Sequence, residues 1–271
     1  MGLLRNTLIL AATLAACDPD APAADDRPVT DQTLTALTTD VAQLRVFDRM
    51  LRPVGLKMLP ADQVVDAAVA QIQDRLKLDL VDPGCLDLTP NPDGLTLRFD
   101  ACNYAANNLV DGQLRLRVEP ESGECDGAPC ILAVRYTLEI DALALGDTEI
   151  TSARSTLRIP TDKSPRVYLG EAELIGPSGD SLSTRTESSW TSAAGCFTAD
   201  FGLEIATDTR EISAAGSALH VCEANCPDSG EGLIAWGSGS TLAWRYTGKG
   251  TLQVRGPKGR VFTVTQACAD K

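Results

Sequence analysis

Cysteine and histidine are the residue types in this 271-residue chain whose spacing allows metal binding or redox chemistry. The chain contains nine cysteines and one histidine, His220. Cys222 and Cys226 are separated by three residues, and two thiolates at this spacing with a nearby imidazole form half of a zinc site. Alternatively, the cysteines pair as disulfides. The compartment decides between these interpretations, because thiols are oxidised in exported proteins.

The first cysteine, Cys17, indicates that compartment. Arg5 precedes an apolar run over residues 8–14, and polarity returns at Asp18. This pattern is typical of a secretory signal and is too short to span a bilayer. The segment Leu14-Ala15-Ala16-Cys17 resembles the lipobox of bacterial lipoproteins. The resemblance implies cleavage before Cys17, its acylation, and stable anchoring of the mature chain to a membrane of the bacterial cell envelope.

The alternative is a soluble secreted protein whose cleavage site happens to precede a cysteine. A polar segment rich in Asp, Ala and Pro follows Cys17, and its composition predicts a disordered tether that favours the anchored form. Asp18 resembles a signal that retains lipoproteins at the inner membrane of some bacteria. The choice between inner and outer membrane stays open.

Acidic side chains dominate the composition, with 37 Asp and Glu against 24 Lys and Arg, or 23 once Arg5 is removed with the signal. A negative surface of this size repels phosphate backbones, which argues against a nucleic-acid partner. It also argues against electrostatic attraction to anionic lipids, so membrane attachment depends on the acyl chains of Cys17. The partner stays open between a protein and an apolar small molecule.

The eight other cysteines form an even set in an oxidising space, which favours disulfides over zinc. Residues opposite each other in a hairpin have position numbers with a constant sum. Cys196 and Cys222 fit a hairpin whose tip lies in the polar residues 208–210. Opposed cross-strand cysteines have about the Cα separation that a disulfide requires. We therefore predict a Cys196–Cys222 disulfide.

Cys85 and Cys102 fit a hairpin centred on Asp93-Gly94, a strong two-residue turn signal. One observation opposes this register, because it also places Asp87 opposite Asp100, and like charges in that position are destabilising. We nevertheless predict a Cys85–Cys102 disulfide.

The remaining cysteines allow two arrangements. Cys125–Cys130 closes the short loop between these two residues, which leaves the pair Cys226–Cys268. The alternative joins Cys222–Cys226 and Cys196–Cys268.

Two amphipathic helices are predicted in residues 30–80. The first has Thr30 or Asp31 as its cap and an apolar face formed by Leu34, Leu37, Val41, Leu44, Phe47 and Leu51. It ends at residues 52–55. The second has Pro60 in its first turn and an apolar face formed by Val65, Ala68, Val69, Ile72 and Leu76. Such short helices need a partner, either the sheet that follows or another protein.

From Cys85 onward the apolar residues recur with a period of two. The clearest sets are Leu95, Leu97 and Phe99; Leu114, Leu116 and Val118; Val134, Tyr136, Leu138 and Ile140; Leu242, Trp244 and Tyr246; and Leu252 and Val254. Arg, Thr, Ser and Glu occupy many of the alternate positions, and Gly, Pro and Asp separate the segments. This pattern is typical of antiparallel strands with one solvated face.

The fold class predicted is therefore mainly β: a large antiparallel meander of about a dozen strands, in a curved sheet or sandwich, with an N-terminal pair of helices. Four segments follow from this interpretation. Residues 1–16 are the signal peptide, 17–29 the acylated cysteine and disordered tether, 30–80 the two-helix segment, and 81–271 the antiparallel β domain with disulfides.

Two further segments carry a family resemblance. Residues 226–230, Cys-Pro-Asp-Ser-Gly, precede alternating strands that lead to Cys268, and residues 99–102, Phe-Asp-Ala-Cys, lead to Asp111-Gly112. Both resemble uncharacterised, cysteine-containing, β-rich bacterial lipoproteins. The resemblance implies a lipid anchor, an antiparallel sheet and the Cys226–Cys268 pairing. It implies no reaction.

Catalytic motifs give no support for an enzyme. His220 lies in an alternating strand, and a serine triad would need a Gly-x-Ser-x-Gly turn, which residues 237–240 do not provide. Zinc-protease, phosphate-loop and dinucleotide motifs are absent from the sequence, and no cofactor is predicted. Trp190, at the end of a strand of Thr and Ser, is the aromatic residue to test for exposure, although core packing is the favoured interpretation.

The sequence thus predicts a lipid-anchored, non-catalytic structural or binding component of the envelope. The first alternative is a carrier whose apolar ligand lies between helices and sheet. Its pocket would be lined by Leu37, Val41, Leu44, Val65, Val69 and Ile72. The second alternative is a hydrolase that uses two carboxylates, for which the sequence cannot supply the separation.

Overall fold

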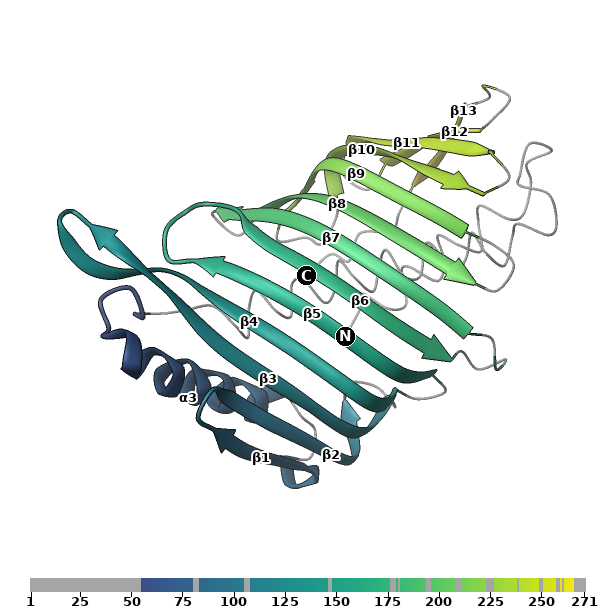
Figure 1. The fold of residues 1–271 in the computed structure, drawn as a ribbon. Coiled ribbons are helices and arrows are strands. Elements are labelled where there is room, and N and C mark those ends of the chain that lie inside the picture. The colour runs from purple at the N-terminus through teal and green to yellow at the C-terminus, as the bar shows by residue number, and fades with distance from the viewer. Residues whose placement is uncertain are drawn as a thin grey trace. The chain divides into compact units, whose positions relative to one another are not determined.

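The computed structural model describes residues 55–79, 83–104, 108–145, 148–175, 179, 181–193, 196–207, 211–222, 227–237, 239–248, 251–256, 259 and 261–265 (Figure 1). These residues are mainly β, as predicted. The elements are α3 (Ala61–Asp79), η1 (Pro83–Cys85), β1 (Leu86–Asn91), β2 (Gly94–Tyr104), β3 (Asn108–Cys125), β4 (Ala128–Leu145), β5 (Thr148–Pro160), β6 (Arg166–Ile175), β7 (Ser181–Ala193), β8 (Cys196–Thr207), β9 (Glu211–Val221), β10 (Pro227–Trp236), β11 (Thr241–Gly248), β12 (Thr251–Arg255) and β13 (Val261–Thr265).

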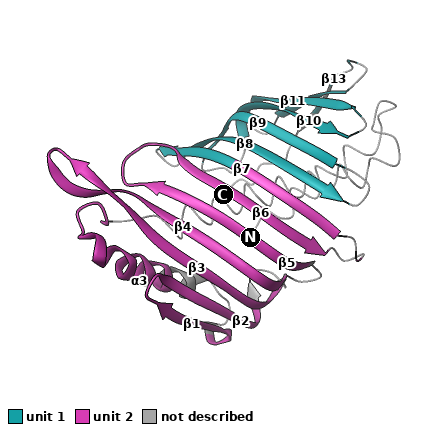
Figure 2. Ribbon diagram, viewed as in Figure 1, with its two compact units in different colours: residues 1–44, 188–271 teal, residues 45–187 magenta. Residues whose placement is uncertain are grey.

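Strands are hydrogen-bonded in the order of the sequence, and every pair with a described register is antiparallel. The predicted antiparallel meander is therefore confirmed. The chain divides into two compact units (Figure 2). Among the described residues, the N-terminal unit extends to Glu187 and the C-terminal unit begins at Ser188, within β7. The predicted segment boundaries at residues 16, 29 and 80 lie outside the described residues.

The structure describes the second of the two predicted helices, which is α3. The first predicted helix, in residues 30–52, lies outside the described residues. Pro60 directly precedes α3, and its carbonyl oxygen accepts a hydrogen bond of 2.9 Å from the amide of Gln63. The apolar face packs against β2 and β3. Ala68, Val69 and Ile72 are buried, as predicted, but the prediction left out Val64, which is fully buried, and included Val65, which is only half-buried. Residues 64, 68 and 72, spaced by four, form the centre of the buried stripe.

The β1–β2 hairpin also differs from its predicted register. The turn is formed by Pro92 and Asp93, with Asn91 opposite Gly94. A proline at the second position of a four-residue turn has the backbone angle that the turn requires, so the turn is centred one residue earlier than predicted. Asp87 consequently lies opposite Arg98, and the unfavourable like-charge pair does not occur.

A bulge in β2 compensates for this earlier turn. Asp100 and Ala101 together lie opposite the single residue Asp111 of β3, and Ala101 has a φ of 47°. The two residues of the bulge carry Cys102 past the end of the regular β1–β2 ladder. Cys85, in η1, is therefore within disulfide distance of Cys102 even though the two do not belong to the ladder.

The core of the N-terminal unit consists of cross-strand rows on one face. Val118, Tyr136 and Leu157 are successive partners across β3, β4 and β5, and each is at most 4% exposed. A second cluster contains the fully buried Cys102 with Val110, Ile140, Leu143 and Ile150. These alternating apolar positions pack inward, as their period of two predicts.

The C-terminal unit repeats this arrangement with different residues. Ile205, Ile212 and Trp236 are successive partners across β8, β9 and β10, and all three are buried. A further row on the same face, four residues along the strands, contains Phe201, Gly216, Gly232 and Trp244. A Cβ atom at either glycine would lie within 3 Å of the Trp244 indole. The indole thus fills the space above two strands that carry no side chain at these positions.

Candidate functional site

The predicted lipidation residue, Cys17, lies outside the described residues, and so do Cys226 and Cys268. Lipidation and the Cys226–Cys268 pairing therefore stay predictions. In the part of the chain that the structure describes, none of the helices has both the length and the apolar character needed to span a bilayer.

The described residues contain three disulfides, Cys85–Cys102, Cys125–Cys130 and Cys196–Cys222, and they coincide with pairs predicted from the sequence. The last one contradicts the alternative in which Cys222 pairs with Cys226. Cys125 and Cys130 flank a two-residue turn in which Asp126 and Gly127 have φ values of 52° and 79°. Positive φ at both positions matches the twist of the adjoining strands.

The three disulfides differ in exposure. Cys102 is fully buried and Cys130 is 4% exposed, so each of the first two disulfides has one end in the core. Cys196 and Cys222 are both half-buried. Of the described disulfides, Cys196–Cys222 is therefore the one with both ends accessible from solvent.

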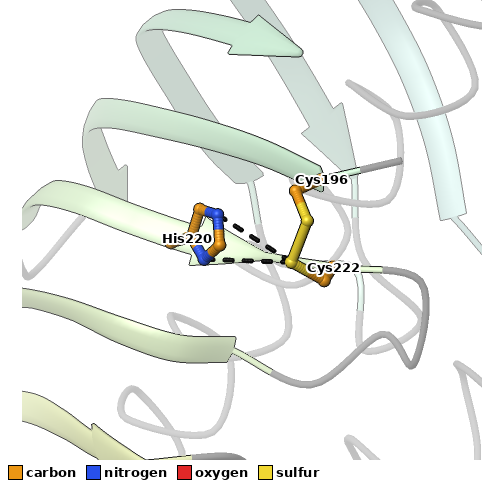
Figure 3. A group of neighbouring side chains, drawn as sticks. All are labelled: Cys196, His220 and Cys222. Atoms are coloured by element: carbon orange, nitrogen blue, oxygen red, sulfur yellow. Dashed lines mark hydrogen bonds between the residues drawn. A yellow bond between two sulfur atoms is a disulfide. The ribbon is translucent and has the colours of Figure 1, made fainter. Parts of the chain in front are cut away.

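His220 is on β9, two residues before Cys222, and lies beside this disulfide (Figure 3). Its Nδ1 and Nε2 atoms are 4.0 and 3.8 Å from the Sγ atom of Cys222. Nδ1 is also 2.7 Å from Oδ1 of Asp228 on β10, and about a third of each of these two side chains is exposed. An ionised carboxylate only accepts hydrogen bonds, so Nδ1 carries the proton and donates it to Asp228.

The ligand atoms of Cys196, His220 and Cys222 lie within 4.8 Å of one another, a grouping suited in size to one metal ion. Zinc prefers thiolates, however, and both sulfurs are held in a disulfide. In this oxidised form the group does not offer the ligands of the zinc site considered from the sequence. That hypothesis used Cys226 as well, which lies outside the described residues.

A second candidate region is the polar face of the N-terminal unit. Arg135 and Arg158 are directly opposite on β4 and β5, which would be an unfavourable pair by itself. The Glu121 carboxylate accepts hydrogen bonds of 2.7 Å from Arg135 and 2.8 Å from Arg158. Glu139 is similarly placed, 2.9 Å from Arg117 and 3.9 Å from Arg154. The arginines of this face therefore share acceptors and are not unpaired anion ligands.

Trp190, the aromatic residue that the sequence singled out for exposure, is only 2% exposed. Its strand, β7, buries Thr186 and Ser188 on the same side, so the small polar residues do not mark a solvated face. Trp190 therefore packs in the core, which is the interpretation that the sequence favoured, and it offers no exposed platform.

Sequence reasoning missed Asp228 as the partner of His220. A signal was present, because a hairpin centred on residue 224 pairs position 220 with position 228 by the constant-sum rule. The observed ladder begins with Pro227 opposite Val221, in agreement with that rule, and then shifts to place Ser229 opposite His220. The irregularity moves the backbone partner by one residue, but the two side chains still meet.

No family model, curated protein or solved structure matched this chain in the comparisons with known proteins.

Proposed function

We propose that this chain is a lipid-anchored protein of a bacterial cell envelope and that its sheet is a non-catalytic structural or binding component. The observation that carries the proposal is the combination of Leu14-Ala15-Ala16-Cys17 with three disulfides in the folded body. Disulfides persist in oxidising compartments, which supports export, and export is the step at which a lipobox is processed.

The polar face of the N-terminal unit supports a role in protein binding. It presents arginines and acids that are already paired, together with Leu169, which is 48% exposed between the charges of β6. Mixed charges around an apolar side chain suit a protein surface better than a polyanion, because each arginine near a carboxylate has lost much of its attraction for phosphate.

Acylation is tested by expressing the full chain in a bacterium that processes lipoproteins. We expect the protein in the membrane fraction, with residues 1–16 removed and acyl chains on Cys17 in the mass spectrum of the N-terminal peptide. The matched control is Cys17→Ser, which should remain unacylated and leave the membrane fraction. A wild-type protein that is water-soluble with an unmodified Cys17 would contradict the proposal.

A second candidate function is the transport of an apolar ligand, and one observation favours it. On the apolar side of the C-terminal unit, Trp244 and Tyr246 are only half-buried. Native mass spectrometry of the Cys17→Ser protein separates this function from the first. A co-purified apolar molecule supports the carrier, and a ligand-free protein that also leaves Trp244 fluorescence unchanged on addition of a fatty acid rejects it.

A further inference from the structure

The Cys196–Cys222 disulfide has surroundings that the other described disulfides lack. Both of its cysteines are reachable from solvent, whereas Cys102 and Cys130 bury one end of the other two. It also has the imidazole of His220 at 3.8 Å, and the chain contains no second histidine. Accessibility and a nearby proton-exchanging group are two properties that control the rate of thiol–disulfide exchange.

The position of His220 determines which of the two sulfur atoms the imidazole can stabilise as a thiolate. Its ring nitrogens lie 3.8 and 4.0 Å from Sγ of Cys222, so Cys222 is the sulfur that the imidazole can serve (Figure 3). Nδ1 donates its hydrogen bond to the Asp228 carboxylate, which leaves Nε2 to exchange a proton with Cys222. A Cys–His pair oriented by a third group is an arrangement that activates thiols.

We propose that Cys196–Cys222 is an exchange-active disulfide, reduced by an external dithiol, with His220 as the group that stabilises the Cys222 thiolate and Asp228 as a positioning residue. The proposal goes beyond the binding role above and does not depend on it. Cys85–Cys102 and Cys125–Cys130 are structural by comparison.

The exchange proceeds in two steps. A thiolate of the external dithiol attacks Sγ of Cys196, the Cys196–Cys222 bond breaks, and its electron pair passes to Sγ of Cys222, whose thiolate is stabilised by His220 after Nε2 takes up a proton from solvent. The second thiol of the dithiol, as its thiolate, then attacks the mixed disulfide and releases Cys196 as a thiolate, which takes a proton from solvent. Two electrons and two protons pass to the protein, and the dithiol becomes a cyclic disulfide.

The test compares the three disulfides within one molecule. Oxidised, folded Cys17→Ser protein is treated with dithiothreitol, aliquots are quenched with an alkylating reagent, and peptide mass spectrometry gives the reduction rate of each disulfide. We expect Cys196–Cys222 to be reduced at least about tenfold faster than Cys125–Cys130, because a core-buried sulfur is shielded from attack. A monothiol such as glutathione should form its mixed disulfide on Cys196 in preference to Cys222.

Substitutions separate chemistry from simple exposure. His220→Asn should slow the reduction of Cys196–Cys222 by about tenfold, which is less than the roughly hundredfold loss typical of an acid–base group in an enzyme active site. Asp228→Asn should slow it less, and Asp228→Glu should restore a rate near that of the wild type. Reduction of Cys125–Cys130 in the same samples must stay unchanged, which controls for unfolding.

Two results would overturn the proposal. Equal reduction rates for the three disulfides in the folded protein would show that the exposed position confers no reactivity. A His220→Asn protein that keeps the wild-type rate would show that exposure alone makes the disulfide reactive, without a contribution from the imidazole.

Discussion

In the N-terminal unit the solvated face of β3, β4 and β5 carries arginines that share carboxylate acceptors, whereas the corresponding face of β9 in the C-terminal unit carries Ser213, Ala215 and Ser217. The inner faces differ as well. Helix α3 supplies apolar side chains to β2 and β3, while Trp244 covers Gly216 and Gly232 of its own sheet. The same antiparallel meander is thus completed by a helix in one unit and by an aromatic side chain in the other.

The difference predicts where each unit tolerates change. Apolar rows such as Val118, Tyr136 and Leu157 lose stability when side chains are shortened, because a cavity forms. The row containing Gly216 and Gly232 is instead sensitive to enlargement, because Trp244 already occupies the space. The comparison would fail if a shortened side chain in the first row cost no stability, or if an enlarged side chain at Gly216 or Gly232 were tolerated.

The largest effect is expected from removing Cys85–Cys102, which ties η1 to the core cluster of the N-terminal unit. The double variant Cys85→Ala/Cys102→Ala should lower the free energy of unfolding by about 3–4 kcal/mol, from loop entropy plus a small cavity at the buried Cys102. Urea denaturation measures the loss, and hydrogen exchange locates it. Loss of protection in β8–β10 but not in β2–β4 would contradict the division into units.

The second effect concerns Gly232. A Cβ atom there would lie 2.1 Å from the carbonyl oxygen of Ala215 and 2.5 Å from Trp244. Because the first contact is with backbone, Gly232→Ala should lower the free energy of unfolding by about 2–3 kcal/mol.

The matched control is Gly202→Ala on β8, two strands away in the sheet, where a Cβ atom would meet nothing within 4 Å. We expect that variant to be as stable as the wild type or slightly more stable. Equal destabilisation by both substitutions would mean that close contact with the Ala215 carbonyl and the Trp244 indole does not explain the effect.

Much of the architecture followed from the period of two. The apolar alternation predicted the strands and the antiparallel order, and the constant-sum rule identified cysteine pairs such as Cys196–Cys222 despite irregular ladders. In that hairpin, the position numbers of the partners Phe197 and Val221 add up to the same value as those of Cys196 and Cys222. A bulge beyond Ala199 changes this sum of position numbers by only one. A single bulge therefore shifts the turn without separating the cysteines.

The parts that escaped prediction depend on irregularity or on neighbours distant in sequence. Ala101 adopts a positive φ, which is uncommon for alanine and cannot be predicted from the residue type. The bulge that sets the Cys85–Cys102 geometry therefore has no signal in the sequence. The Arg135–Glu121–Arg158 group required knowing which strands adjoin and in what register. Val64 and Val65 differ by about 100° around the helix axis, and only contact with the sheet decides which is buried.

The third prediction concerns the aromatic face of the C-terminal unit. Burial raises the pKa of Tyr246 to about 12, from an ordinary value of 10.0. The folded state therefore keeps a proton that the unfolded state loses, so this contribution to stability is complete below pH 10 and is lost as the pH rises toward 12.

The free energy of unfolding should fall by about 2 kcal/mol over this pH range. This is somewhat less than the rise in the pKa of Tyr246 implies, because the ring is partly exposed. Tyr246→Phe should remove this alkaline limb from the stability profile, and ultraviolet absorbance should show one tyrosine fewer titrating near pH 12. If the Tyr246→Phe protein lost stability above pH 10 as the wild type does, the Tyr246 hydroxyl would be exposed to solvent in the folded protein.

The smallest effect tests the charged face of the N-terminal unit. Glu121 accepts from two opposed arginines and its side chain is 26% exposed, whereas Glu171 lies 3.8 Å from Arg185 with both side chains more than 70% exposed. Glu121→Gln should cost about 1 kcal/mol, because Arg135 and Arg158 then face each other without a shared anion. Glu171→Gln, the matched control, should change stability by less than about 0.5 kcal/mol.

Salt separates these two effects further. Ions screen the repulsion between Arg135 and Arg158, so 1 M NaCl should recover part of the stability lost in Glu121→Gln and leave Glu171→Gln unchanged relative to the wild type. If both variants were equally neutral at low salt, the charged face would contribute solubility and not stability. The contrast between the two units would then rest on their inner faces alone, where α3 and Trp244 complete the packing.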